Sequence, residues 1–196
     1  YNSMYSFALL KLKTLDDNDE IQKNSYEAFA RFRLCSENHS GALYHLALCY
    51  RDGIGTNKDV KKAADLFEQA SNNGIIDANC DLALCYLKGE GKEQDKEKAI
   101  KLLTEASELG SLHASYWLAR CYLSGDGVAE DKIHAAKLLR TASEGGYTEA
   151  TYLLASCLHK GEGINPEEFS YSTLEEARAL LETAALKGHA DASFEL

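Results

Sequence analysis

Small and apolar residues recur with a period of 36 along most of the chain. Each repeat opens with an alanine, carries a Leu-Ala pair four residues later and then a cysteine. The Leu-Ala pairs are Leu46-Ala47, Leu82-Ala83, Leu118-Ala119 and Leu154-Ala155. A spacing of three to four residues places these positions on one face of a helix, whereas a strand would alternate. The pattern therefore predicts a helix at the start of each repeat.

Each of these helices is followed by Gly-x-Gly and a second apolar stripe. The glycine pairs are Gly53/Gly55, Gly89/Gly91, Gly125/Gly127 and Gly161/Gly163. Glycine supplies the left-handed backbone that a tight turn after a helix needs. An N-cap residue for the second helix comes next: Asp59, Asp95, Asp131 and, with Glu176 completing a capping box, Thr173. A further glycine ends each second helix, at Gly74, Gly110, Gly146 and Gly188.

The repeating unit is thus a helix pair of about 36 residues. One such pair cannot bury its own apolar face, but stacked copies can bury it against one another. We therefore predict an all-α solenoid of stacked antiparallel helix pairs, forming one domain over 1–196. Its parts are a degenerate repeat or N-terminal cap at 1–41, repeats at 42–77, 78–113, 114–149 and 150–191, and the start of a further repeat at 192–196.

The first 41 residues fit the repeat only loosely. A second helix is expected over 24–34, with Asn24 and Glu27 as its capping box, and a first helix over 6–13. The fourth repeat is longer than the others, and its surplus lies in the segment INPEEFSYST between Gly163 and the second helix. A loop is where chains tolerate such an insertion.

The pattern Ala-x-x-x-Leu-Ala-x-x-Tyr-x-x-Gly-x-Gly, followed by Asp and then by Lys98-Ala99, resembles the Sel1-like repeat. The likeness covers 42–196 closely and 1–41 loosely. It implies a right-handed superhelix related to tetratricopeptide arrays, and an adaptor function without general catalytic activity. The chain departs from the family pattern in two ways. It has Leu-Ala where Leu-Gly is usual, and the aromatic residue usual in the second helix occurs only as Phe67.

Six cysteines raise the question of disulfides. A secreted branch of the family staples neighbouring helices with two cysteines about eight residues apart across the glycine. Here Leu43 stands eight residues after Cys35, and Asn72 stands eight before Cys80, so neither staple is complete. The ladder Cys49, Cys85, Cys121, Cys157 would sit on helices about 8–10 Å apart, too far for a disulfide or a shared zinc ion. We expect six free thiols and no metal site.

Charge and composition exclude further classes of protein. The net charge is −10, which disfavours nucleic acids and anionic membranes as partners. No apolar run approaches the roughly 20 residues that span a bilayer, so no membrane insertion is expected. Since the chain begins with Tyr1, we expect a fragment of a longer protein. With free thiols, the expected location is the cytoplasm or another reducing compartment, and a bacterial effector acting inside a host cell would fit.

No constellation of residues predicts catalysis. Gly-x-Gly before a helix is reminiscent of a phosphate loop, but the full Walker pattern is missing and a turn written four times is structural. The six histidines share no repeat position. We predict no enzyme and no cofactor.

The remaining candidate is a protein-binding surface. In tetratricopeptide arrays the first helix of each pair lines the concave groove, and the resemblance places ten residues there: Tyr44, Leu48, Arg51, Leu84, Leu87, Tyr116, Arg120, Leu123, Tyr152 and His159. Tyrosine and arginine are enriched where proteins bind one another, and grouped exposed leucines mark docking sites. The predicted function is a scaffold or adaptor that binds a peptide or helix of another protein.

Three alternatives stay open at this point. The tyrosines could instead pack between repeats. The groove could bind a small ligand, such as a cell-wall component, or regulate an enzyme. The array could also be a structural spacer, although apolar leucines in the groove favour a peptide over a sugar or a spacer.

Overall fold

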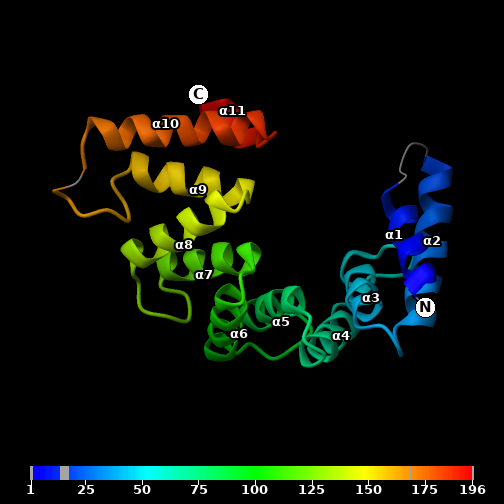
Figure 1. Ribbon diagram of the computed structural model, residues 1–196. Coiled ribbons are helices and arrows are strands. Elements are labelled where there is room, and N and C mark those ends of the chain that lie inside the picture. The colour runs from blue at the N-terminus through cyan, green and yellow to red at the C-terminus, as the bar shows by residue number, and fades with distance from the viewer. Residues whose placement is uncertain (1, 14–17, 168, 196) are drawn as a thin grey trace. The chain divides into compact units, whose positions relative to one another are not determined.

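A computed structural model describes residues 2–13, 18–167 and 169–195, and Tyr1 and Leu196 at the ends of the predicted domain lie outside these ranges (Figure 1). The described residues form helices and connecting turns, without a strand. The contacts divide the chain into two compact units, Tyr1–Asp95 and Lys96–Leu196. The division falls inside a predicted repeat, between its first and second helices.

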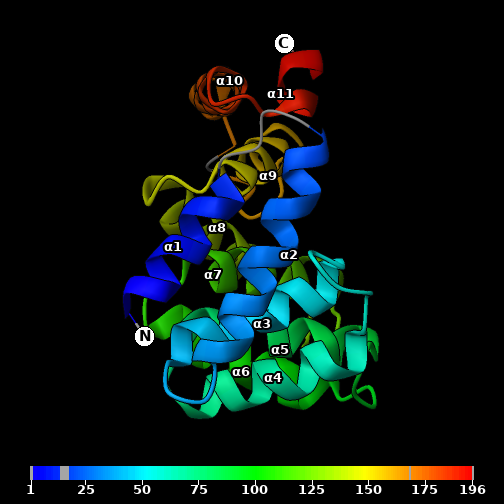
Figure 2. The same cartoon turned by 90° about the vertical axis from the view of Figure 1, so that its right-hand side faces the viewer.

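The first unit contains five helices among the described residues. They are α1 Asn2–Lys13, α2 Asn18–Cys35, α3 Ser40–Asp52, α4 Val60–Asn72 and α5 Ile76–Lys88. Each helix packs against the next one along the chain (Figures 1 and 2). The predicted pairing of first and second helices is therefore confirmed in this unit.

The second unit continues the same alternation. Its helices are α6 Lys96–Glu108, α7 Leu112–Ser124, α8 Lys132–Glu144, α9 Thr148–His159, α10 Tyr171–Leu186 and the short α11 Ala190–Glu195. Here, too, each helix packs against its successor. Helix α11 contains the buried Ala192, at the predicted start of a further repeat.

Two of the predicted aspartate caps are confirmed and two predicted cap sites are wrong. Asp59 accepts a hydrogen bond from the Lys62 amide at 3.0 Å, and Asp131 accepts one from the His134 amide at 2.8 Å. In the fourth repeat the N-cap lies three residues before the predicted Thr173, and the helix begins at Tyr171. Ser170 is the N-cap there, and its amide donates to the Thr173 hydroxyl at 3.3 Å.

The other incorrect cap lies in the N-terminal region. The helices expected over 6–13 and 24–34 both exist, as parts of α1 and α2. Helix α2, however, begins at Asn18, so Asn24 lies inside it and is only 2% exposed. The capping-box spacing was misleading because Asn24 faces the core of this unit rather than a helix end.

The two glycines of each turn have different structural roles. In the turn after α5, Gly89 and Gly91 have φ values of 71° and 75°, as predicted for left-handed positions. A Cβ atom on Gly89 would meet nothing closer than 3.5 Å. On Gly91 it would lie 2.2 Å from the backbone oxygen of Val60 on α4. The first glycine therefore provides only the left-handed backbone of the turn. The second glycine does the same and also lets the turn pack closely against α4.

The core is built mainly from small residues. The alanines of the Leu-Ala pairs and those of the second helices are buried, which lets consecutive helices approach closely. Larger side chains fill one position in each of the second helices α4, α6 and α8, where Phe67, Leu103 and Leu139 are each 0% exposed. Leucine therefore replaces the aromatic residue at Leu103 and Leu139, and the position stays buried.

Hydroxyl pairs join consecutive repeats in the second unit. The Ser107 and Ser115 side chains lie 2.7 Å apart across the α6–α7 turn, and the Ser143 hydroxyl donates to Thr151 at 2.9 Å across the α8–α9 turn. Both pairs are eight residues apart across the glycine. Each pair therefore joins a second helix to the first helix that follows it.

Candidate protein-binding surface

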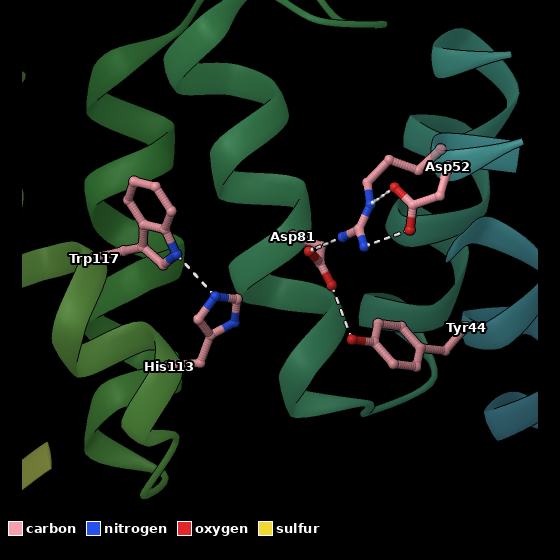
Figure 3. Close-up of polar contacts among 6 residues, drawn as sticks. Tyr44, Asp52, Asp81, His113 and Trp117 are labelled. Carbon is pink, nitrogen blue, oxygen red and sulfur yellow. Dashed lines mark hydrogen bonds and ion pairs between the residues drawn. The ribbon is translucent and has the colours of Figure 1, made fainter. Parts of the chain in front are cut away.

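A buried carboxylate organises the predicted surface of the first unit. Asp81 on α5 is 4% exposed. It accepts hydrogen bonds from the Tyr44 hydroxyl at 2.9 Å and from Arg51 Nη1 at 2.8 Å (Figure 3). A carboxylate can be buried at tolerable cost only when such partners replace water. The network therefore ties α3 to the first helix of the next repeat.

Arg51 holds a second carboxylate as well. Its Nε and Nη2 atoms donate to the two oxygens of Asp52 at 2.9 and 2.8 Å, which is a bidentate contact (Figure 3). The hydrogen bonds to Asp52 and the nearby charge of Asp81 raise the pKa of Arg51. Burial, followed by the charge of Asp81, raises the pKa of Tyr44 well above its usual value. Both side chains keep their protonated forms over any physiological pH.

A hollow of about 200 Å³ opens beside this network. It is bounded by α3, α4, α5 and the turn after α5, and its lining consists of Arg51, Val60, Ala63, Phe67, Asp81, Leu84, Cys85, Lys88 and Glu90. Ala63 and Phe67 give it an apolar floor, since both are fully buried behind it. Arg51 and Leu84, two of the predicted groove residues, meet here.

The second unit presents an aromatic surface instead. The ring centroids of Tyr116 and Tyr147 lie 5.3 Å apart, and those of Tyr116 and Trp117 lie 5.5 Å apart. The Trp117 indole donates to His113 Nε2 at 2.8 Å (Figure 3). The exposed guanidinium of Arg120 lies 4.5 Å from the Trp117 ring centroid, within range of a cation–π interaction.

The ten predicted groove residues differ in exposure. Leu87 is buried, at 9%. Arg120 and His159 are exposed, and the half-buried ones are Tyr44, Leu48, Arg51, Leu84, Tyr116, Leu123 and Tyr152. Partial burial is typical of an anchor residue in an unbound protein interface, and it is also typical of a residue that packs between repeats. Their role in binding stays a prediction.

All three tyrosines contact the next first helix or the residue just before it. The Tyr44 hydroxyl donates to Asp81 on α5, and Tyr116 lies against Tyr147. Tyr152 stacks on His189, with ring centroids 4.3 Å apart. Packing between repeats, left open by the sequence, is thus observed. All three residues are only half-buried, which leaves part of each accessible to a partner.

Sequence reasoning missed Asp81 and Tyr147. Asp81 stands one residue before a Leu-Ala pair, where the other repeats have His45, Trp117 and Leu153. A carboxylate at a position where the other repeats have larger side chains could have indicated a buried ion pair. Tyr147 gave no such signal, because its position varies from repeat to repeat.

The repeat cysteines have the properties of packing residues. Burial raises the pKa of the Cys49 thiol to about 12 and the pKa values of Cys85, Cys121 and Cys157 to about 11. A thiol with a raised pKa carries little of the reactive thiolate at neutral pH. Within the described ranges, no three His, Cys, Asp or Glu side chains lie close enough together to hold a metal ion.

The repeats also match a known family. The Sel1 repeat model matches residues 40–75, 76–111, 112–147 and 148–189, which is most of the chain. The chain belongs to the Sel1 repeat family. These segments begin at 40, 76, 112 and 148, whereas the repeats predicted from the sequence begin at 42, 78, 114 and 150. The two divisions differ only in the residue chosen as the start of each repeat. A comparison with curated proteins gave no match.

Solved structures with the same fold are similar along the whole chain. A Sel1 repeat protein from Oxalobacter formigenes is 25% identical over 100% of this chain and 76% of that one, with a TM-score of 0.83. A protective antigen of uropathogenic Escherichia coli with an SLR fold is 20% identical over 100% of this chain and 48% of its own, with a TM-score of 0.71. These likenesses establish the α-solenoid predicted from the repeat.

A cysteine-rich protein is also among the similar structures. Cysteine-rich protein B of Helicobacter pylori is 24% identical over 71% of this chain and 96% of its own, with a TM-score of 0.53. Sel1 repeat proteins are generally non-catalytic scaffolds that bind other proteins. Among the helices of this Sel1 repeat chain that the structure describes, none is long and apolar enough to cross a membrane.

Proposed function

We propose that this Sel1 repeat chain is an adaptor that binds a peptide or helix of another protein along the exposed side of its first helices, without catalysing a reaction. The observation that carries the proposal is the hollow beside Arg51 and Leu84. It combines an apolar floor with charged edges, which is the composition of a site that accepts a protein side chain.

The aromatic surface of the second unit supports the same function. Tyr116, Trp117 and Arg120 are of the residue types that carry most of the affinity in protein interfaces. They are half-buried or exposed and already held in place by ring contacts, so binding would cost little side-chain entropy. The two surfaces are proposed as separate contact points of one scaffold function.

The test is a selection of binding peptides from a random 16-residue library on the immobilised chain. Peptides that use the proposed surface should lose affinity about tenfold or more on Leu84→Ala or Arg120→Glu, because truncated or reversed contacts at an interface centre cost more than about 1.4 kcal/mol. Lys101→Ala and Lys137→Glu change exposed positions of the second helices α6 and α8 and are the matched controls.

Melting temperatures measured in parallel separate lost binding from lost folding. Selected peptides that bind Leu84→Ala and Arg120→Glu as tightly as the parent, but fail on Lys137→Glu, would place binding on the second helices and refute the proposal. Repeating the assay with a soluble cell-wall fragment tests the ligand-binding alternative.

A further inference from the structure

The second unit repeats an ion pair at equivalent positions of its turns. A lysine at the start of a second helix reaches the acidic residue between the two glycines of the next turn. Lys96 pairs with Asp126 and Lys132 pairs with Glu162, each with a nitrogen-to-oxygen distance of 2.8 Å. Both lysines are joined to the following repeat in this way.

The equivalent positions of the first unit lack the lysine. Val60 stands 36 residues before Lys96, and Glu90 stands 36 residues before Asp126. Val60 and Glu90 both line the 200 Å³ hollow beside Arg51 and Leu84. Among the residues that the structure describes, none forms an ion pair with Glu90, which is exposed at the edge of the hollow. Valine carries no charge, so the ion pair that the second unit forms at these positions has no counterpart between Val60 and Glu90.

The chemistry of the hollow matches the missing side chain. Its floor of Val60, Ala63, Phe67 and Leu84 suits the four methylenes of lysine, which pack along apolar surface while the ammonium stays at the edge. Among the charges, Arg51 is held by two carboxylates, Asp52 and Asp81. The lining also contains Lys88 and Glu90. Together with Asp52, which pairs with Arg51 from outside the lining, there are three acids and two bases in and beside the hollow, and one added cation would balance them.

The presence of Lys88 in the lining does not prevent a second cation from pairing with Glu90. In the equivalent turn of the second unit, Lys160 corresponds to Lys88, and both Lys160 and Lys132 lie close enough to Cys157 to act on its ionisation, together with Glu162. The Lys132–Glu162 pair forms there all the same. Lys88 is therefore compatible with a cation beside Glu90.

We propose that the hollow lined by Val60, Leu84 and Glu90 binds a lysine side chain of the partner protein, in the position that the chain's own lysines occupy in the second unit. The inference rests on the proposed scaffold function, because it names one side chain that the partner inserts. The stem of that lysine packs on Val60 and Phe67, and its ammonium pairs with Glu90.

The closing experiment uses a small probe, so that it does not depend on finding the partner. Amide chemical shifts of the full chain are followed while N-acetyl-lysine-N-methylamide is added to millimolar concentration. The norleucine and glutamate analogues serve as probes without the cation and with the opposite charge. The lysine probe should shift the amides around Val60, Leu84 and Glu90 and bind at least about threefold more tightly than norleucine, the range expected for an edge ion pair.

Two variants locate the effect. Val60→Lys fills the hollow from within and should abolish the shifts, while Glu90→Gln should reduce lysine binding to the norleucine level. Equal binding of lysine and norleucine, preference for the glutamate probe, or unchanged shifts in Val60→Lys would each overturn the inference. Peptides from the library selection that bind the groove equally well on Val60→Lys would also refute it, and they would leave the scaffold function standing.

Discussion

The two units use the same repeat and present different surfaces. In the first unit, α3 and α5 are tied by the Tyr44–Asp81–Arg51 network, and the hollow next to it is open. In the second unit, Lys132 stands at the position equivalent to Val60 and pairs with Glu162, while the exposed surface is aromatic. The Leu, Ala and Gly positions are alike in both, so they specify the scaffold.

The difference shows that single positions outside this framework determine what each repeat can bind. Val60 in place of a lysine leaves the lining of the hollow without the charge that Lys96 and Lys132 carry, and Asp81 in place of Trp117 exchanges an aromatic contact for a buried ion pair. A repeat protein can therefore change its recognition surface one residue at a time, because each helix pair contacts only its neighbours.

Among the features that the two units share, the second glycine of the turn should contribute most to stability. Gly91→Ala is expected to lower the free energy of unfolding by about 3 kcal/mol or more, since the new Cβ would overlap the Val60 backbone oxygen in addition to straining a left-handed residue. Gly89→Ala has the strain alone and should cost about 1–2 kcal/mol. Urea denaturation measures both, and equal losses would contradict the assigned roles.

The hydroxyl pair of the second unit offers a way to stabilise that unit alone. Ser107→Cys combined with Ser115→Cys should form a disulfide on mild oxidation, because the two oxygens are already 2.7 Å apart. Closing so short a loop is worth about 2–3 kcal/mol. Thermal melting of the oxidised and reduced forms tests this, with Ser115→Cys as the control, and oxidation without any gain in stability would contradict it.

The buried ion pair of the first unit should respond to mutation as a unit. Arg51→Met should cost about 2 kcal/mol because it leaves the Asp81 carboxylate partly unpaired in the interior. Adding Asp81→Leu should restore much of that loss, since an apolar pair needs no compensating charge. The control in the second unit is Arg120→Met, which should change urea stability little. A double variant less stable than Arg51→Met would contradict this account.

The first unit should also be the more sensitive to acid. Burial lowers the pKa of His45, whose ring stacks on Phe32 and lies near Tyr5, Tyr44 and His39. The unfolded chain therefore binds the proton more readily, so the stability present above a pH of about 6.5 is lost as the pH falls below that value. Melting temperatures at pH 8 and pH 5 should differ less in His45→Phe, and an unchanged difference would contradict this.

The smallest expected effect on stability comes from opening the second hollow. Lys132→Val removes an ion pair between two half-buried surface side chains and should leave the melting temperature almost unchanged. It should nevertheless give the second unit a new response to the lysine probe near Glu162. If no amide of the second unit shifts in this variant, the equivalence between the two places is wrong.

The sequence by itself determined the helices and their order. The recurrence of Leu46-Ala47 at three further positions predicted one helical face per repeat, and Gly-x-Gly predicted the turns, because both depend on local backbone preferences. Local rules failed at Thr173 and Asn24. In the first case a competing cap stood three residues earlier, and in the second a polar residue inside a helix imitated a helix start.

Only the tertiary structure decided which side chains meet. Tyr44 and Asp81 are 37 residues apart and Lys132 and Glu162 are 30 apart, so no local pattern joins them. Their contacts depend on how one repeat is packed against the next, which is fixed by close approaches such as that of Gly91 to α4. The open hollow has the same origin: Val60 is an ordinary helix residue in the sequence, and it marks an absent lysine only when the stacked repeats place it beside Glu90.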